Sequence, residues 1–444
     1  MKDEISLQTR REFLRTTLLG GALTWTVPAF LADTFSVLQA EAAQASTQVQ
    51  TGRDGAILVI LQMAGGNDGV NTVVPFANDF YRKARPRLSL AETRVLKINE
   101  EIGLHPSLGG FKELYDAGQL SIVQGVGYPN PNRSHFRSTE IWQTASDSNK
   151  FESHGWLGRY FDNACSGCEP TVAVNVGRQM PQAFSAKTPK GISLDNPRNY
   201  RFMTADGGRA GEMSAAEESY RKLNQADDEE TTQNAGGSIG AISGGVRHSG
   251  SVLDFVERTA LDAQVSSDQI RAISSRVQNQ ASYPGSQLGE SLKLVARLIG
   301  GQLPTRIFYV SQGGYDTHTN QAGAHERLLK DLGDSVKAFV DDMKAQGNRE
   351  RVLVMTFSEF GRRVAENASG GTDHGAAAPL FLIGSKVKSG LLGKYPSLAP
   401  QDLHQGDLKY NVDFRSVYAS VLEGWLKTRS ELVLRKKFPL LEVV

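Results

Sequence analysis

Short, nearly continuous apolar runs constrain the fold of this chain more than any other feature of its sequence. The clearest run covers residues 56–62, Ala-Ile-Leu-Val-Ile-Leu-Gln. A strand that is apolar on both faces has to be covered on both faces, which is typical of parallel sheets between two layers of helices. Five comparable runs cover residues 120–126, 171–176, 306–310, 351–356 and 380–383.

Amphipathic helical patterns lie between or after these runs. In residues 325–345 apolar side chains recur three and four positions apart, from Leu328 to Met343, so one face of this helix is expected to pack on the sheet. Similar patterns cover residues 106–117, 134–145 and 414–427. The alternation predicts one α/β domain with a mostly parallel sheet flanked by helices.

Residues 208–300 depart from this alternation, because they contain few strand-like runs. Helical patterns at 251–263, 269–280 and 288–300 predict a helical insertion or cap on the main domain. A polar, glycine-rich stretch at 234–250 interrupts the insertion and is typical of a loop.

The composition excludes several classes of protein. The chain of 444 residues has 49 basic and 48 acidic side chains, a formal charge of +1, so no global basic field favours nucleic acid as a partner. Two cysteines are too few for a disulfide-dense scaffold. Cys165 and Cys168 predict a small loop disulfide, the alternative being half of a zinc site that lacks a second Cys-x-x-Cys.

The first 45 residues have the order of an export signal. Arg10 and Arg11 precede an apolar stretch at 18–32, and small residues follow around Ala42. This order predicts a twin-arginine signal peptide, with an apolar stretch too short to span a bilayer comfortably. We therefore expect the twin-arginine translocase as a partner during export. Residues 46–444 are then expected to be periplasmic or exported, with no stable membrane anchor after cleavage.

Acidic turns follow three of the apolar runs, and a fourth acidic turn precedes the last run. The carboxyl ends of parallel strands form the usual ligand-binding edge of an α/β sheet. A cluster of acids and imidazoles at that edge would be costly without a cation among them. Mixed carboxylate and imidazole ligands predict one or two divalent ions, of Zn, Mn, Mg or Ca. The candidate metal ligands are Asp68, Asp316, His318, Glu359, Asp373 and His374.

These residues also have structural interpretations when each is taken alone. Asp68 stands between an asparagine and a glycine and could simply make a turn. Glu359 could form a structural salt bridge with Arg362 or Arg363. Asp316 and His318 are separated by one residue, so both would point to the same side of an extended chain, as two ligands of one ion would.

Ser134 is the candidate nucleophile, because it stands where the predicted helix 134–145 begins. A hydroxyl at a helix start lies beside free backbone N–H groups that also bind anions, although any serine there could serve only as a cap. A nearby metal would lower the pKa of the hydroxyl. Arg133 and Arg137 could hold the oxygens of the anion, and Ser138 is the alternative nucleophile.

The remaining histidines give weaker signals. His325, at the start of a helix, could be a further metal ligand, although such a histidine is more often solvated. His135 lies beside Ser134 and could reach the same site, but its spacing does not decide this. The others have no acidic partner pattern and are assigned structural roles: His105, His154, His248 and His404.

Five motifs occur in a fixed order along the chain: Gly65-Gly-Asn-Asp-Gly-Val-Asn71, Arg133-Ser-His-Phe136, Gly313-Gly-Tyr-Asp-Thr-His318, Ser358-Glu-Phe-Gly-Arg362 and Gly371-Thr-Asp-His-Gly375. On these motifs the sequence resembles, over nearly its whole length, the twin-arginine-exported bacterial family of unknown function fifteen hundred and one. That family is placed in the alkaline phosphatase and sulfatase superfamily.

The resemblance implies an alkaline phosphatase-like fold with a metal centre at the strand ends. It implies an early metal-binding aspartate, here Asp68, and a nucleophile at a helix start, here near Ser134. Late ligands of such a centre would be Asp316, His318, Asp373 and His374. The cysteine signature of formylglycine sulfatases is absent.

The sequence thus predicts an exported, metal-dependent hydrolase of phosphate or sulfate esters, acting on an anionic ester substrate. Ser134 and Arg133 would be its catalytic residues, with the six ligands above holding the metal. The alternative is a non-catalytic periplasmic binding or structural protein that keeps the fold.

Overall fold

The structure, a computed structural model, describes residues 55–165, 168–188, 191–194, 266 and 268–444. The predicted signal peptide at 1–45 lies outside the described residues, as does the predicted insertion between 208 and 265. The signal and the domain boundaries therefore stay predictions.

A nine-stranded sheet forms the centre of the described part of the chain. The strands follow the order β11-β5-β10-β9-β1-β8-β6-β7, and β12 also pairs with β5. The strand bounds are β1 Ile57–Met63, β5 Leu120–Gly127, β6 Ala173–Val176, β7 Ile192–Leu194, β8 Ile307–Gln312, β9 Val352–Phe357, β10 Ala378–Ile383, β11 Gly390–Leu392 and β12 Val412–Asp413.

The sheet is mostly parallel, as the apolar runs predict. β1 pairs in parallel with β8 and β9, and its seven residues are all buried. β10 is the exception, because it runs antiparallel to both of its neighbours, β5 and β9. The loop between β9 and β10 therefore begins and ends at the edge where the loops after β1, β5 and β8 lie.

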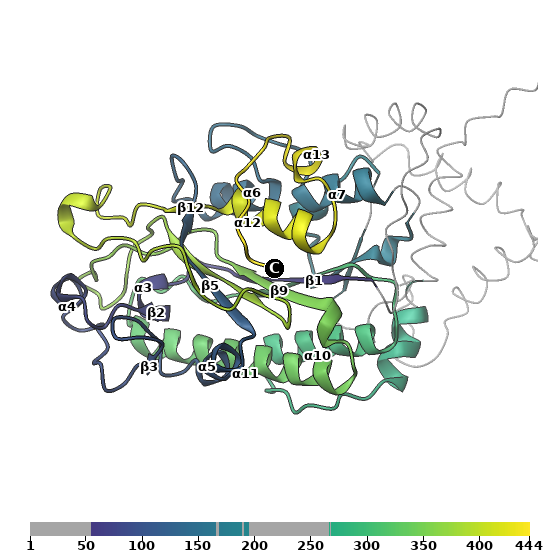
Figure 1. The fold of residues 1–444 in the computed structure, drawn as a ribbon, viewed down its shortest axis with the longest axis horizontal. Coiled ribbons are helices and arrows are strands. Elements are labelled where there is room, and N and C mark those ends of the chain that lie inside the picture. The colour runs from purple at the N-terminus through teal and green to yellow at the C-terminus, as the bar shows by residue number, and fades with distance from the viewer. Residues whose placement is uncertain (1–54, 166–167, 189–190, 195–265, 267) are drawn as a thin grey trace, which may run out of the picture. The chain divides into compact units, whose positions relative to one another are not determined.

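Helices cover both faces of the sheet (Figure 1). One layer contains α6, α7, α12 and α13, and the other contains α5, α10 and α11. The helix bounds are α5 Gly109–Asp116, α6 His135–Thr144, α7 Trp156–Ala164, α10 Gln287–Gly300, α11 Gln321–Ala345, α12 Phe414–Ser420 and α13 Ser430–Leu434. The predicted α/β fold class is therefore confirmed.

The last helix of the predicted insertion, α10, packs beside α11 and β8 in the layer that covers the sheet. Its buried face carries Leu288, Leu292 and Val295. A further helical segment covers residues 268–276. Within the described ranges, no helix combines the length and the apolar character that a membrane span requires.

A smaller sheet and two short helices lie next to the end of β1. The sheet has the order β2-β4-β3. The bounds are α3 Gly69–Thr72, β2 Val73–Val74, α4 Asp79–Ala84, β3 Leu96–Lys97 and β4 Gly103–Leu104. At the end of α7, Cys165 and Cys168 form the predicted loop disulfide.

Stacked aromatic rings hold the layer of α6, α7 and α12 together. Trp156 stacks on Tyr418 with ring centroids 4.3 Å apart, and Trp142 stacks on Phe414 at the same separation. Trp142 also lies 5.4 Å from Phe357 of β9, which joins the helices to the sheet. Large buried aromatic rings contribute more apolar burial than any other side chains.

We predict that Trp156→Ala lowers the free energy of unfolding by about 3–5 kcal/mol, because it removes a buried ring and leaves a cavity in its place. Urea denaturation followed by tryptophan fluorescence or circular dichroism measures the change. Leu432→Ala, at a half-exposed position of α13, is the control and should stay within about 0.5 kcal/mol of the wild type. Equal effects of the two substitutions would contradict the packing role of Trp156.

Candidate metal centre

Four loops meet at one edge of the sheet and carry the candidate site. They follow β1, β5, β8 and β9, and the last of them leads into β10. A loop before a strand reaches this edge only when the strand runs opposite to its neighbours, as β10 does. An isolated antiparallel bridge between Arg362 and His374 joins the two ends of the loop between β9 and β10.

Glycines let these loops approach each other more closely than side chains would allow. A Cβ atom at Gly65 would lie 2.5 Å from the backbone nitrogen of Asp316, and Gly65 has a φ of +119°. A Cβ atom at Gly371 would lie 2.3 Å from the carbonyl carbon of His318. Both positions therefore require glycine, which is consistent with the glycine-rich motifs around the acidic turns.

The buried guanidinium of Arg362 holds the loops together. It donates to the carbonyl oxygens of Gly65, Gly66, Tyr315 and Thr372, and its Nη2 donates to Asp316 Oδ1 at 2.7 Å. Burial alone would raise the pKa of Asp316, but the hydrogen bond and the positive charge of Arg362 outweigh burial and lower this pKa to about 2. Asp316 is therefore ionised at neutral pH.

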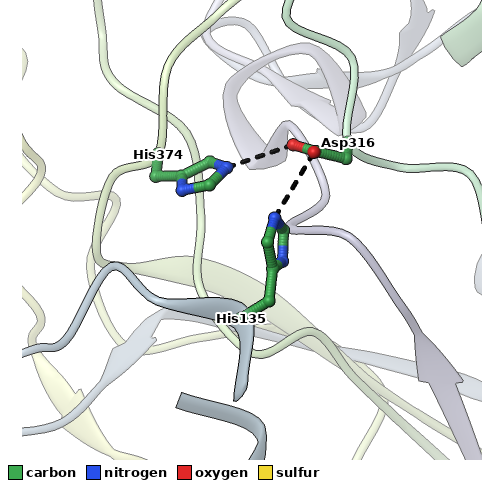
Figure 2. Close-up of side chains that lie close together, drawn as sticks. All are labelled: His135, Asp316 and His374. Atoms are coloured by element: carbon green, nitrogen blue, oxygen red, sulfur yellow. Dashed lines mark hydrogen bonds and ion pairs between the residues drawn. The ribbon is translucent and has the colours of Figure 1, made fainter. Parts of the chain in front are cut away.

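Three side chains, two from loops and one from the start of α6, converge on one point (Figure 2). One potential ligand atom from each of His135, Asp316 and His374 lies within 4.8 Å of the other two. The Nε2 atom of His374 is 3.1 Å from Asp316 Oδ1, and the Nε2 atom of His135 is 3.4 Å from Asp316 Oδ2. We call these three residues the His–Asp cluster.

The hydrogen bonds behind the two rings fix where their protons lie. His374 Nδ1 is 2.8 Å from the carbonyl oxygen of Arg133, which can only accept. Nδ1 therefore donates, and in the neutral form of the ring Nε2 presents a lone pair to Asp316. His135 Nδ1 is 2.9 Å from Glu359 Oε1, so the same argument applies to its Nε2. Two lone pairs then face one carboxylate.

Glu359 thus lies behind His135. Its Oε1 also accepts from the backbone nitrogen of Gly65 at 2.8 Å. Glu359 is predicted as a metal ligand, but the structure places it as the partner that orients an imidazole. The sequence leaves the role of His135 open, because a histidine after the candidate nucleophile gives no spacing signal.

His318 lies at the edge of the cluster. Its Nε2 is 2.9 Å from His374 Nε2 and 3.1 Å from Asp316 Oδ1. Its Nδ1 is 3.3 Å from Asp373 Oδ1, which Asn367 also contacts at 3.1 Å. The hydrogen bond from Asn367, followed by that from His318, lowers the pKa of Asp373. Asp373, like Glu359, therefore orients a ring, whereas His318 is a fourth candidate ligand.

Asp68 lies away from this arrangement. Its Oδ2 accepts from Arg85 Nη1 at 2.6 Å and from Gln321, and both charged side chains are fully buried. Burial acts to raise the pKa of Asp68, but the charge and the hydrogen bond of Arg85 lower it overall. The structure therefore supports the structural interpretation of Asp68, at the start of α3, over the prediction that it binds metal.

Ser134 stands immediately before α6, as predicted, and its side chain is exposed. It makes no side-chain cap hydrogen bond, so its hydroxyl does not cap the start of the helix. Ser138, the alternative nucleophile, is fully buried and bonds to Tyr128 and to the carbonyl oxygen of Glu359. The geometry therefore favours Ser134 over Ser138 as a reactive hydroxyl.

The two arginines proposed to hold an anion have different surroundings. Arg137 forms an ion pair with Glu140 at 2.7 Å, and its Nη2 donates to the carbonyl oxygens of Asp147, Ser148 and Lys150. These interactions hold its guanidinium against the loop after α6. Arg133 instead bonds to the buried carboxylate of Asp407 through Nε, at 2.9 Å, and Nη2.

His325 is buried away from the cluster. Its Nε2 is 3.0 Å from Asn67 Oδ1, and its ring lies edge-to-face against His105 at 5.8 Å between centroids. Burial lowers the pKa of each of these two histidines to about 4. Both are therefore neutral core side chains. The sequence predicts a structural role for His105, whereas it offers His325 as a possible further metal ligand.

The cluster fits a divalent cation by the chemistry of its donors. His135 Nε2 is buried and has no hydrogen-bond partner, although it points at a carboxylate. Each imidazole has an oriented second nitrogen, which is the usual arrangement behind metal-binding histidines. Two or three imidazoles and one carboxylate are ligands that suit zinc or manganese.

The fold and the cluster together define an α/β protein with a polar centre at the carboxyl edge of its sheet. The chain belongs to the family described as "Protein of unknown function (DUF1501)", whose model matches residues 56–436. The resemblance drawn from the five motifs is therefore confirmed. No curated protein matches the sequence.

Several solved structures are similar to this chain at low identity. A sulfatase, PsFucS1, from Pseudoalteromonas sp. is 10% identical with a TM-score of 0.35, over 93% of this chain and 74% of its own. A protein in the alkaline phosphatase superfamily from Vibrio parahaemolyticus is 11% identical, with a TM-score of 0.34, over 93% and 80%. The phosphonate monoester hydrolase of Agrobacterium radiobacter is 9% identical with a TM-score of 0.33, over 86% and 78%. These TM-scores are too low to support an argument about the site, so the site rests on this chain's own residues.

We predict that Arg85→Met lowers the free energy of unfolding by about 3–5 kcal/mol at pH 7, because Asp68 is left as a buried charge without a partner. The stabilisation from the lowered pKa of Asp68 is present above about pH 4 and is lost as the pH falls through the folded pKa. In Arg85→Met the effect of burial remains, and it raises the pKa of Asp68, so the carboxylate of the variant takes up a proton as the pH falls. The difference in unfolding free energy between variant and wild type should therefore narrow from pH 7 to 4 and narrow further below pH 4, in urea titrations at each pH.

The control is Arg82→Met, which breaks the exposed pair with Asp79. Exposed pairs contribute at most about 1 kcal/mol, so this change should be small and nearly independent of pH. If Arg85→Met were as mild as Arg82→Met, Asp68 would not depend on Arg85, and its assignment as a structural residue would be wrong.

Proposed function

We propose that this protein is an exported, metal-dependent hydrolase of phosphate or sulfate esters. One observation carries the proposal: the Nε2 atoms of His135 and His374 lie 3.4 and 3.1 Å from the carboxylate oxygens of Asp316, and the partners of both Nδ1 atoms leave a lone pair on the Nε2 of each neutral ring facing that carboxylate. A divalent ion relieves that repulsion. His135, Asp316 and His374 would hold the ion, with His318 as an additional ligand. Glu359 and Asp373 would orient the rings.

A bound divalent ion would polarise an ester oxygen and lower the pKa of a nearby hydroxyl. Ser134 supplies that hydroxyl from the position before α6, next in sequence to His135. Its oxygen would attack the phosphorus or sulfur atom, the alcohol of the ester would leave, and water would then release the acid from the serine. Arg133 would contribute positive charge to the oxygens of the reacting group.

Export by the twin-arginine route is part of the proposal, and it is supported by Arg10 and Arg11 and the apolar stretch that follows them. That route carries folded proteins, which fits a site assembled from loops far apart in the sequence. The translocase would be a partner only during export.

We predict that the purified protein binds close to one zinc or manganese ion and that His374→Ala removes most of it. Glu359→Gln should weaken binding by about 10–100-fold, because His135 then loses the carboxylate that orients it. Elemental analysis after reconstitution, with competition against a chelator, measures both effects. His154→Ala, outside the His–Asp cluster, is the control and should bind as the wild type does. Reconstituted wild-type protein without metal would exclude the metal centre.

We predict that Ser134→Ala lowers turnover of aryl phosphates or aryl sulfates by about 10³-fold or more and leaves the metal content unchanged. A screen with both ester classes, together with elemental analysis of each variant, measures this. Ser153→Ala, at an exposed serine before α7, is the control. Bound metal without turnover of any ester in the wild type would favour the non-catalytic binding or structural protein.

A further inference from the structure

A second arginine lies beside Arg133, and neither the motifs nor the proposed chemistry assigns it a role. Arg363 follows Arg362 in the loop after β9. Arg362 turns inward to hold the loops, whereas the side chain of Arg363 is 38% exposed. Arg133 comes from the loop after β5, and its side chain is 33% exposed. The two residues are 230 positions apart in sequence, so only the fold brings them together.

Both guanidinium groups share one buried carboxylate. Asp407 Oδ2 accepts from Arg133, and its Oδ1 lies 3.7 Å from Arg363 Nε. The Asp407 side chain is almost fully buried, so solvent screens these interactions only weakly. One negative and two positive charges leave a net positive charge at the surface. Asp407 Oδ1 and Arg363 Nε are both buried without a hydrogen-bond partner.

The pair is also fixed to the His–Asp cluster through the backbone. The carbonyl oxygen of Arg133 accepts from His374 Nδ1 at 2.8 Å. The backbone nitrogen of Arg363 donates to the carbonyl oxygen of Asp373 at 3.0 Å. Arg85 holds the carbonyl oxygen of Arg363 at 2.9 Å. The backbone of both arginines is therefore held in place by residues of the candidate metal centre.

The guanidinium groups retain donors that Asp407 does not use. A guanidinium has five N–H donors, and Arg133 uses Nε and one Nη on Asp407, while Arg363 has only the long contact of its Nε. Planar guanidinium groups bind the oxygens of phosphate, sulfate and carboxylate in pairs. A buried carboxylate that holds two arginines in place lowers the entropy lost when they bind an anion.

We propose that Arg133 and Arg363, positioned by Asp407, form an oxyanion-binding subsite next to the His–Asp cluster. The subsite takes a second acidic group of the substrate, with Arg363 on that group and Arg133 shared between it and the reacting group, so preferred substrates are esters that carry another phosphate, sulfate or carboxylate. The inference rests on the proposed function only in taking the reacting group to be an ester. Binding of an oxyanion by the two arginines does not depend on turnover.

The first test measures binding of inorganic sulfate to chelator-treated, full-length protein by isothermal titration calorimetry. The wild type should bind sulfate saturably, and Arg363→Gln should weaken binding by about tenfold, because the subsite then loses its net charge and one bidentate donor. Arg349→Gln is the matched control: its side chain is 39% exposed, and it lies before β9, at the opposite end of the strand from Arg363. Its affinity should equal that of the wild type.

Thermal denaturation of each variant shows whether it is folded, and Arg363→Gln should be as stable as the wild type because Arg133 still pairs with Asp407. Equal sulfate affinity in Arg363→Gln and the wild type would overturn the subsite. So would the absence of saturable sulfate binding in the wild type. Either result can be obtained whether or not the metal-loaded protein hydrolyses esters, so failure of the subsite and failure of the proposed function are distinguishable.

The second test compares two aryl phosphates with the metal-loaded protein, one of them with a carboxylate on the ring. Arg363→Gln should raise KM about tenfold for the carboxylated ester and change KM little for the plain ester. An equal loss for both esters would mean that Arg363 acts on the reacting group, and it would overturn the assignment to a second acidic group.

Discussion

The buried guanidinium of Arg362 is the interaction on which the candidate site depends. It satisfies carbonyl oxygens from three loops and contacts the carboxylate of Asp316. A fully buried arginine lowers the stability of the fold unless its N–H donors form hydrogen bonds. Here the acceptors come from the loop after β1, the loop after β8 and the loop before β10. Those loops therefore have one relative arrangement in which this charge is accommodated. The position of Asp316 follows from that arrangement.

The direction of a single strand decides which histidine completes the cluster. Asp316 follows a parallel strand and reaches the carboxyl edge in the usual way. His374 precedes its strand, and it reaches the same edge because β10 is antiparallel to β5 and β9. Had β10 been parallel, the Gly371–Gly375 turn would lie at the opposite edge of the sheet. One reversed strand thus allows the site to draw on both ends of the loop between β9 and β10.

The sequence predicts the sheet well because strands that are buried on both faces carry an unmistakable apolar pattern. It also predicts which loops hold the chemistry, since acids after such strands lie at one edge. It does not distinguish a ligand from the residue that orients a ligand. Glu359 and Asp373 have the same charge and place as Asp316, yet each lies behind an imidazole. Asp68 bonds to Arg85, 17 positions away, and nothing in its motif reveals that partner.

The residues of the cluster come together only in the complete fold. His135 and Glu359 are 224 positions apart, and Asp316 and His374 are 58 apart. In the unfolded chain these side chains are far apart, so an ion that binds here would bind the native state alone. Its binding free energy would then add directly to the stability of the sheet. Such an ion would also not initiate folding, because the long chain segments between its ligands must first close into loops before the ligands can meet. Occupancy of the centre would therefore report on whether the molecule is already folded.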